Sequence, residues 1–391
     1  MGKPLTFFLI AGEPSGDALG AALMAGLKIR VPDARFAGVG GPLMESEGLT
    51  SLFPMQELSI MGIAEVLPKL PGLLARVRET VAQVAATAPD ALITIDSPDF
   101  CLRVARKVRA ANPAQRVVHY VAPSVWAWRP ERAAKMAPTV DQVLCLLPFE
   151  PPFMQEVGMR ADFVGHPIAG EEPSIYDDVS AFRARHHIDP EAKILLALPG
   201  SRRGEVDRLA PIFGAALKTY CAVFPKTKII LPTVAPLADR VRHLTQDWPG
   251  SPLILSPGAD MAEFKAEKAT AFAAADLALA ASGTVSLELA ASDTPMVIAY
   301  DMNWISRRII ASKLLIDTVT LVNLVSETRT VPELLGKACT PEAIAEKLAE
   351  ITRAPEAQRG AMQLTMERLG RGGLAPGLRA ADAVLDGLSN G

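Results

Sequence analysis

Short apolar runs alternate with longer amphipathic stretches along the chain, and this pattern predicts strands and helices in turn. In the first half, Ala18–Ile29 and Leu73–Ala86 have the helical spacing of apolar residues. The apolar runs predicted there as strands are Thr6–Ala11, Arg35–Val39, Ala91–Ile95, Val117–Val121, Val143–Leu147 and Asp162–Val164. Strands that alternate with helices are typical of a mostly parallel sheet with helices on both faces.

A second series of the same kind follows a polar, proline-containing linker at Gly170–Asp178. At 391 residues, the chain suits two domains better than one. We therefore expect two doubly wound α/β domains. In the second, the predicted strands are Lys193–Leu198, Lys228–Leu231, Leu253–Leu255, Leu277–Ala280 and Met296–Ala299, and helices begin near Glu205, Ala235, Met261 and Thr284.

Composition narrows the possible functions. The net charge of −3 provides no global attraction to nucleic acid or to an anionic surface, so a bound anion needs a local site. The four cysteines lie far apart without a CxxC pair, which indicates free thiols. No run approaches the roughly 18 apolar residues of a membrane span. Neither HExxH nor a D-x-D pair is present, so the sequence predicts no metal site and no cofactor.

Polar loops follow two neighbouring strands of the first half. Ligands of open α/β sheets bind where parallel strands end, so these loops indicate one side of a cleft. Asp96 comes first off the strand Ala91–Ile95 and suits a general base for a substrate hydroxyl. Asp99 better suits the cap of a helix that starts near Leu102, and an Asx-turn or cap is the alternative for both aspartates. The next loop, up to Arg129, holds two of the four tryptophans.

Two further positions in the first half stay open. The glycines of Ala11–Asp17 allow close backbone approach before a helix start that attracts anions. The same turn is equally consistent with simple helix capping by Ser15 or Asp17. His166 lies near the expected domain junction, where a lone histidine is more often structural than functional.

Two loops of the second half are suited to phosphate. Pro199–Glu205 follows a strand and offers backbone N–H groups and the fork of Arg202, although a solvated surface turn is the alternative. Ala281–Glu288 follows another strand, and its small residues at a helix start can hold a diphosphate. Glu288 lies one turn beyond Thr284 and can accept hydrogen bonds from ribose, whereas capping by Ser282 or Thr284 is the simpler alternative. Two such loops in one domain favour a nucleotide.

Two segments have the composition of a membrane-adjacent surface. Ile60–Leu74 is apolar, and its prolines oppose one long helix. Trp304–Leu315 mixes apolar and basic residues, as interfacial helices do. Ordinary core packing is the alternative for each.

Eight strings in one order carry a resemblance over essentially the whole chain. The chain resembles the lipid-A-disaccharide synthase family of bacterial glycosyltransferases. The matching strings are AGEPSGD (Ala11–Asp17), MGIAEVL (Met61–Leu67), DSPDF (Asp96–Phe100), PSVWAWR (Pro123–Arg129), LPFE (Leu147–Glu150), VGHP (Val164–Pro167), PGSR (Pro199–Arg202) and ASGT…LE (Ala281–Glu288). One departure is Cys101, where the family commonly has Asn, and it affects only the contacts of that amide.

The resemblance implies a GT-B fold, in which two Rossmann-like, doubly wound domains face each other across a cleft. Residues 1–168 would form the acceptor and membrane side, and residues 169–365 the UDP-sugar donor side. Residues 366–391 would form a helical segment that packs back on the N-terminal domain or on a partner chain. A homodimer that exchanges these C-terminal segments is a further implication.

The implied reaction transfers 2,3-diacylglucosamine from UDP-2,3-diacylglucosamine to lipid X, which is 2,3-diacylglucosamine 1-phosphate. Its products are the β-1,6-linked lipid A disaccharide 1-phosphate and UDP. The resemblance implies an inverting, metal-independent hexosyltransferase at the cytoplasmic face of the inner membrane of a Gram-negative bacterium, peripherally bound. No nucleic-acid partner is expected.

Residues and resemblance together predict the site. Asp96 is the expected catalytic base. The expected donor-binding residues are Gly200, Ser201, Arg202, Ser282, Gly283, Thr284, Glu288 and Asn323. The expected acceptor or cleft residues are Glu13, Ser15, Gly16, Asp17, Asp99, Ser124, Trp126, Arg129 and His166, and the expected membrane or acyl contacts are Met61, Val66, Leu67, Leu70 and Leu74.

Two other functions compete with this prediction. A UDP-sugar 2-epimerase-like enzyme shares the GT-B architecture but needs no apolar acceptor pocket. A non-catalytic nucleotide-sugar-binding protein would tolerate any change of Asp96.

Overall fold

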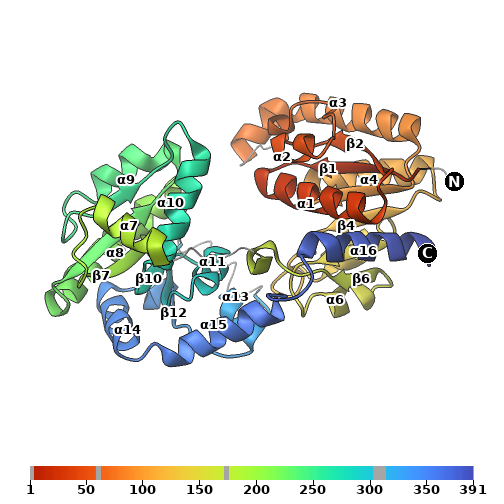
Figure 1. The fold of residues 1–391 in the computed structure, drawn as a ribbon. Coiled ribbons are helices and arrows are strands. Elements are labelled where there is room, and N and C mark those ends of the chain that lie inside the picture. The colour runs from red at the N-terminus through yellow and green to blue at the C-terminus, as the bar shows by residue number, and fades with distance from the viewer. Residues whose placement is uncertain (1–3, 59–62, 171–175, 303–313, 391) are drawn as a thin grey trace. The chain divides into compact units, whose positions relative to one another are not determined.

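The computed structural model describes residues 4–58, 63–170, 176–302 and 314–390, with residues 63–69 and 176–177 described by their backbone alone (Figure 1). The chain forms two compact units. Unit 1 comprises Met1–Gly170 together with Leu369–Gly391, and unit 2 comprises Glu171–Arg368. Each unit is built on a parallel sheet of six described strands, which confirms the predicted α/β class.

The sheet of unit 1 has the strand order β2-β1-β3-β4-β5-β6. Its central strands are almost wholly buried because their residues are apolar and both faces are covered by helices. The strands are β1 (Thr6–Ala11), β2 (Arg35–Val39), β3 (Ala91–Ile95), β4 (Val117–Tyr120), β5 (Gln142–Cys145) and β6 (Arg160–Phe163).

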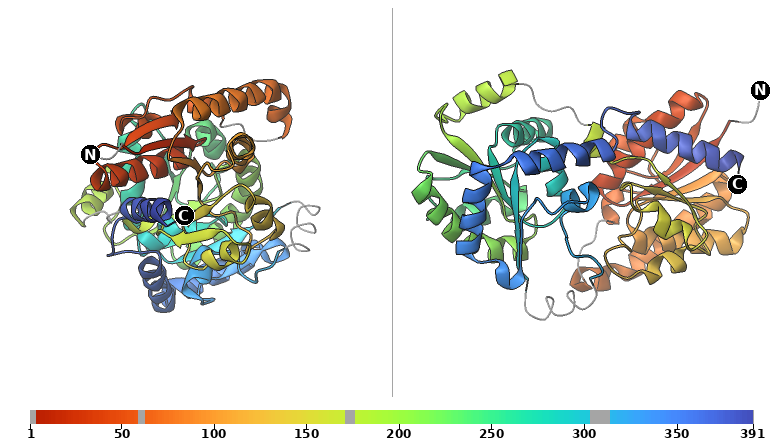
Figure 2. Two further views of the ribbon diagram at one scale, coloured as in Figure 1. Left: turned by 90° about the vertical axis from the view of Figure 1, so that its right-hand side faces the viewer. Right: turned by 90° about the horizontal axis from the view of Figure 1, so that it is seen from below.

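Helices of unit 1 cover both faces of this sheet. Helix α3 contacts α4, and α1 contacts α16 and α2 (Figure 2). Right-handed crossovers place α1 and α4 on opposite faces, because the chain leaves β1 in one direction and β3 in the other. The helices are α1 (Pro14–Arg30), α2 (Pro42–Ser46), α3 (Ile63–Thr87), α4 (Pro98–Ala111), α5 (Glu131–Met136), α6 (Pro151–Gln155) and α16 (Pro376–Ser389), with short 3₁₀ turns at Met55–Glu57 and Pro167–Gly170.

The sheet of unit 2 has the order β12-β11-β10-β7-β8-β9. Its strands are β7 (Lys193–Leu198), β8 (Thr227–Pro232), β9 (Leu253–Leu255), β10 (Leu277–Ala280), β11 (Met296–Tyr300) and β12 (Glu333–Leu335). Its helices are α7 (Tyr176–Arg185), α8 (Arg203–Val223), α9 (Ala238–Leu244), α10 (Met261–Ala273), α11 (Val285–Ala291), α13 (Leu321–Ser326), α14 (Pro341–Arg353) and α15 (Glu356–Arg368), with 3₁₀ turns at Ala235–Leu237 and Gly336–Ala338.

Both sheets reverse their strand order once. In unit 1 the reversal lies between β1 and β3, and in unit 2 it lies between β7 and β10. At such a point, the loops that leave two neighbouring strands turn toward opposite faces and leave a crevice between them. Each unit therefore has one favoured position for a ligand, at the carboxyl ends of these strand pairs.

Most predicted strands are confirmed, and the differences have local causes. Strand β5 ends at Cys145 instead of Leu147, because the amides of Leu146 and Leu147 donate to the Glu150 carboxylate at 3.1 and 3.0 Å. Strand β4 ends at Tyr120, since Val121 has a left-handed φ of 82°. The short edge strand β12 was not predicted, because half-buried residues without an apolar run give little strand signal.

The predictions for two helices require correction. Helix α1 begins at Pro14, a residue suited to the first helical position, and its N-cap is Glu13 rather than Ser15 or Asp17. Helix α3 runs from Ile63 through Pro68 and Pro71, the two prolines that were predicted to prevent one long helix. Its later turns are anchored by buried Val77 and Val84, which supports the helix beyond the prolines.

The C-terminal helix α16 packs against α1 of its own chain through a contact between glycines. A Cβ atom added at Gly26 would lie 2.5 Å from the Gly377 carbonyl oxygen, and one added at Gly377 would lie 2.4 Å from the Ala22 oxygen. Backbone atoms cannot yield as a flexible side chain can. Glycine at both positions therefore sets the distance between the two helices.

We predict that Gly377→Ala lowers the free energy of unfolding by about 1–3 kcal/mol, because the added methyl group forces α16 away from α1. Urea unfolding followed by circular dichroism measures the change. Gly360→Ala, at an exposed position of α15 with nothing near the added Cβ, is the matched control and should be neutral or stabilising. Equal stability of the two variants would contradict the close-contact argument.

Candidate functional site

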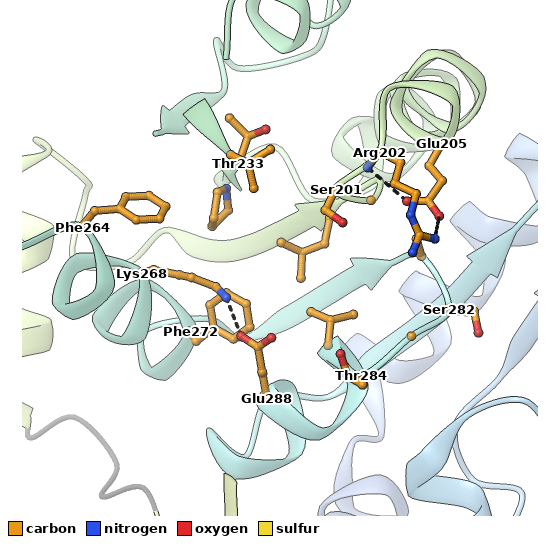
Figure 3. A pocket seen from close by; sticks show the side chains of 17 residues that line it. Ser201, Arg202, Glu205, Thr233, Phe264, Lys268, Phe272, Ser282, Thr284 and Glu288 are labelled. Atoms are coloured by element: carbon orange, nitrogen blue, oxygen red, sulfur yellow. Dashed lines mark hydrogen bonds and ion pairs between the residues drawn. The ribbon is translucent and has the colours of Figure 1, made fainter. Parts of the chain in front are cut away.

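A pocket of about 440 Å³ opens at the carboxyl ends of β7 and β10 in unit 2, where the strand order reverses. Seven of the eight residues predicted from sequence to bind the donor line it, namely Gly200, Ser201, Arg202, Ser282, Gly283, Thr284 and Glu288. Figure 3 shows the side chains of Ser201, Arg202, Ser282, Thr284 and Glu288 along the wall of this pocket. The two loops that the sequence singled out are therefore brought together by the sheet.

The loop after β7 is ordered by the carboxylate of Glu205. This group accepts hydrogen bonds from the Arg202 amide at 3.3 Å, the Arg202 guanidinium at 3.4 Å and the Tyr300 hydroxyl at 3.3 Å. Gly200 has a φ of +113°, and a Cβ atom there would lie 2.5 Å from a Glu205 oxygen. Burial and the neighbouring Glu205 charge raise the pKa of Tyr300. The Arg202 side chain stays 70% exposed, so its guanidinium is accessible to a ligand.

The loop after β10 is tied to the end of β7 and leads into α11. The Ala281 amide donates to the Leu198 carbonyl at 2.8 Å, and the Ser286 hydroxyl donates to the Gly283 carbonyl at 3.0 Å. Thr284 is the N-cap of α11, but its side chain makes no capping hydrogen bond. Its hydroxyl, at the pocket wall, therefore does not cap the helix.

Sequence reasoning missed the wall of the pocket that α10 supplies. Phe264, Lys268 and Phe272 line the pocket, and their spacing of four residues places them on one face of the helix. Lys268 forms an ion pair with Glu288, with 2.5 Å between Nζ and Oε2. The four-residue spacing of Phe264, Lys268 and Phe272 was a signal in the sequence that they share one helix face. Only the fold shows that this face of α10 meets the two loops. Glu205, Thr233 and Val234 also line the pocket without having been predicted as ligands.

Asn323 does not belong to this pocket, which corrects the prediction. Its side chain is fully buried, and its amide nitrogen donates to the Thr318 hydroxyl at 3.2 Å and the Val331 carbonyl at 2.9 Å. Its oxygen accepts from the Val331 amide at 3.0 Å. The amide group is saturated within the fold, so it holds the chain around α13 together.

Asp96 lies at the reversal point of unit 1, directly after β3. The backbone of Asp96 and that of Ser97 have positive φ values of 49° and 41°. Consecutive left-handed non-glycine residues are strained, and such strain persists where the surrounding structure enforces it, often at functional sites. Among the described residues, no hydrogen bond or ion pair engages the Asp96 carboxylate. The half-buried group is therefore accessible to a ligand.

The turn after β1 lies beside this loop, since β1 pairs with β3. A Cβ atom at Gly12 would lie 2.5 Å from the Ser97 hydroxyl, so the two loops are in contact. Of the residues predicted here, Ser15 is exposed, Glu13 is half-buried and Gly16 is buried against Ile95.

Asp17 has a structural role that the sequence did not separate from ligand binding. Its side chain is buried, and its oxygens accept hydrogen bonds from the amides of Gly41 at 2.9 Å, Leu43 at 3.0 Å and Met44 at 3.0 Å. These are the otherwise unpaired donors at the start of α2. Its two oxygens are occupied by these amides, so we remove Asp17 from the predicted acceptor residues.

The loop after β4 presents one half-buried and one exposed tryptophan. The Trp126 indole donates to the Glu150 carboxylate at 3.2 Å, and its ring packs edge-on against Phe149. Burial raises the pKa of Glu150 to about 7. Arg129 has a left-handed φ of 53° and lies over the ring of Trp128, 4.2 Å from its centroid. Ser124, also predicted, is exposed on the same loop.

The remaining predicted residues of unit 1 have distinct environments. His166 follows β6, its Nδ1 accepts from the Ile168 amide at 3.2 Å, and burial lowers its pKa to about 4. Asp99 is exposed in the first turn of α4 and is not its N-cap, which is Ser97. Cys101 is fully buried, and its thiol faces the carbonyls of Ile10 at 3.8 Å and Ile95 at 4.0 Å. Cys101 is thus part of the core.

The predicted membrane contacts are only partly described. Leu70 and Leu74 are each 37% exposed on α3. Met61 and the side chains of Val66 and Leu67 lie outside the described residues, as does most of Trp304–Leu315. In the described part of the chain, no helix is both long and apolar enough to cross a bilayer. The same residues include no cluster of three or more His, Cys, Asp or Glu side chains that could hold a metal.

Comparison with known proteins gives matches along nearly the whole chain. The family profile described as lipid-A-disaccharide synthetase matches residues 7–372. The lipid-A-disaccharide synthase of Ruegeria pomeroyi is 60% identical over 388 residues, with 99% of this chain and 96% of that protein covered. The enzyme of the same name from Rhodospirillum centenum is 45% identical, with 98% and 95% covered.

Solved structures with the same fold are much more distant in sequence. The calicheamicin glycosyltransferase CalG4 has a TM-score of 0.61 at 16% identity, with 100% of this chain and 99% of that chain covered. The UDP-GlcNAc 2-epimerase of Neisseria meningitidis bound to UDP-GlcNAc has a TM-score of 0.59 at 13% identity, with 99% of each chain covered. These likenesses concern the fold alone, and they confirm the GT-B architecture.

We predict that Asp17→Ala lowers the free energy of unfolding by about 1–3 kcal/mol, because it leaves buried amides at the start of α2 unpaired. Denaturant unfolding measures the change, and Ser15→Ala on the same turn, which is exposed, serves as the control. A stable Asp17→Ala protein that had lost only affinity for an acceptor would return Asp17 to the ligand site.

Proposed function

The chain belongs to the lipid-A-disaccharide synthase family, and from this we propose that it transfers 2,3-diacylglucosamine from its UDP donor to lipid X. Membership makes it a hexosyltransferase of lipid A biosynthesis. The proposed products are the β-1,6-linked disaccharide 1-phosphate and UDP. The observation that carries the proposal furthest is that four of the eight family motifs, AGEPSGD, DSPDF, PGSR and ASGT…LE, follow the strands at the two strand-order reversals, one in each unit.

Unit 2 would bind the donor through the pocket at β7 and β10. Arg202 and the amides at the start of α8 would hold the diphosphate, since a guanidinium fork and a helix start both favour phosphate oxygens. Glu288, on the opposite wall, would accept hydrogen bonds from ribose hydroxyls. The Arg202 guanidinium and these amide dipoles would stabilise the charge that develops on the leaving UDP, so we propose that transfer needs no divalent metal.

Unit 1 would supply the acceptor site and the base. In one displacement, the acceptor 6-hydroxyl oxygen bonds to C1 of the donor sugar while Asp96 takes the hydroxyl proton. The bond from C1 to the diphosphate breaks, and UDP leaves with the electron pair. A single displacement inverts the configuration at C1, which agrees with a β-linked product. The exposed Ser124 and Arg129 on the neighbouring loop, with Ser15 and Glu13, are the proposed acceptor contacts.

Two acylated substrates require access to a lipid phase. Leu70 and Leu74 on α3 are exposed although they are large and apolar, and Arg78, one turn further, is exposed as well. Exposed apolar residues beside a basic residue suit an anionic bilayer surface. We propose that this part of α3 contacts the membrane, at the cytoplasmic face of the inner membrane.

The competing epimerase function rests on fold alone, because epimerases of the same fold are only 10–13% identical to the chain. The two functions differ in one assay. Incubation of the protein with UDP-2,3-diacylglucosamine should release UDP only when lipid X is added. Release of UDP without acceptor, or conversion of a UDP-sugar to its 2-epimer, would contradict the proposal.

We predict that Asp96→Asn slows transfer by about 10²–10⁴-fold, because the amide keeps the shape but cannot accept the hydroxyl proton. UDP affinity, measured by calorimetry, should remain unchanged. Asp33→Asn, at an exposed position between α1 and β2, at the amino end of the sheet, is the control and should turn over normally. Near-normal turnover of the Asp96→Asn variant would eliminate Asp96 as the base.

We predict that Arg202→Ala weakens UDP binding by about 10- to 100-fold, as expected for loss of a charge-assisted hydrogen bond to phosphate. Arg203→Ala is the matched control, since Arg203 is 77% exposed and does not line the pocket. Equal UDP affinity of the two variants would mean that the diphosphate lies elsewhere.

A further inference from the structure

The ion pair between Lys268 and Glu288 joins two helices at the wall of the pocket in unit 2. Lys268 extends from α10 and Glu288 from α11, with 2.5 Å between Nζ and Oε2 (Figure 3). Both residues line the pocket. The proposed function uses Glu288 but assigns nothing to Lys268.

Stability of the fold is a weak explanation for this pair. The two side chains are 33% and 36% exposed, and ion pairs exposed to this extent contribute little because water screens them. Core packing already joins this region, as Phe272 and Leu287 are buried in the respective helices. The main effect of the ion pair is therefore on the position of the Glu288 carboxylate.

The Glu288 carboxylate is bound to Lys268 through one oxygen, and no described residue engages the other oxygen. The Lys268 ammonium lies 5.1 Å from the centroid of the Phe272 ring, one turn further along α10, so the lysine is itself fixed between an aromatic face and Glu288. Among the described residues, the hydrogen bond and ion pair of the Glu288 carboxylate involve Oε2 alone. Oε1 is thus available to a ligand hydroxyl.

Charge gives a second reason for a lysine at this position. The charged residues that line the pocket are Arg202, Lys268, Glu205 and Glu288, two cations and two carboxylates. A nucleoside diphosphate is strongly anionic. Without Lys268, an uncompensated carboxylate would face this ligand and repel it.

We propose that Lys268 is a positioning residue that fixes the Glu288 carboxylate for a ribose hydroxyl and so makes the pocket selective for a ribonucleoside diphosphate over its deoxy analogues. This inference rests on the proposed function, which places ribose at Glu288. A carboxylate held in place binds a ligand hydroxyl at one position with little loss of conformational freedom. A freely rotating carboxylate gains less from that hydroxyl, because it hydrogen-bonds to water nearly as well as to the ligand.

The test compares affinities of the full chain for UDP, 2′-deoxy-UDP and 3′-deoxy-UDP by calorimetry. We expect at least one deoxy analogue to bind about tenfold or more weakly than UDP, as a lost hydrogen bond to a charged acceptor implies. In Lys268→Met this ratio should fall below about threefold, and Lys268→Arg should restore most of it. Lys265→Met, an exposed lysine on the same helix outside the pocket, is the matched control and should keep the wild-type ratio.

A double-mutant cycle separates positioning from a direct contact of Lys268 with phosphate. If Lys268 acts through Glu288, Glu288→Gln abolishes the deoxy discrimination, and adding Lys268→Met changes the ratio no further. A ratio unchanged in Lys268→Met, or an equal loss of affinity for all three nucleotides, would overturn the inference. So would wild-type protein that binds UDP and both deoxy analogues equally well. Wild-type protein that bound no UDP at all would instead refute the proposed function.

Discussion

The reversal of strand order within each parallel sheet is the constraint on which both candidate sites depend. Because crossover connections are right-handed, a chain that leaves neighbouring strands in opposite directions sends its helices to opposite faces. The loops after β1 and β3, and those after β7 and β10, consequently diverge and leave their backbone groups accessible. In unit 1 this position holds Asp96, and in unit 2 it holds the pocket around Arg202.

Carboxylates hold the loops around these positions. Asp17 pairs the amides at the start of α2, Glu150 joins the loops after β4 and β5, and Glu205 orders the loop after β7. Glu333 accepts in the same way from the amides of Val319 and Thr320 at 2.9 and 2.7 Å. Loops at the carboxyl ends of strands have many unpaired N–H groups. One carboxylate oxygen of Asp17, and one of Glu150, accepts from two such groups at once. The carboxylate of Asp96, which no hydrogen bond or ion pair engages within the described part of the chain, differs from all of these.

The same contrast explains why some predicted residues line the pocket and others are bound within the fold. Gly200, Arg202 and Thr284 lie in the loops that follow β7 and β10. Their place in the chain was therefore enough to locate them at the carboxyl ends of these strands. Asn323 and Asp17 carry the right chemical groups, but their hydrogen bonds are made within the fold. Which partner a polar group finds depends on segments distant in sequence, such as Gly41 for Asp17. Periodicity and residue type hold no information about that choice.

The sequence by itself determined the α/β class, most strand positions and the loops that carry the chemistry. It did so because burial of parallel strands demands apolar runs, and because a ligand loop must follow such a run directly. Only the tertiary structure decided the strand order, and with it which loops meet. It also brought Lys268 of α10 to Glu288 of α11, since that contact depends on how two helices pack on one face of the sheet. Pairwise geometry of this kind arises from packing between elements, and no local pattern along the chain encodes it.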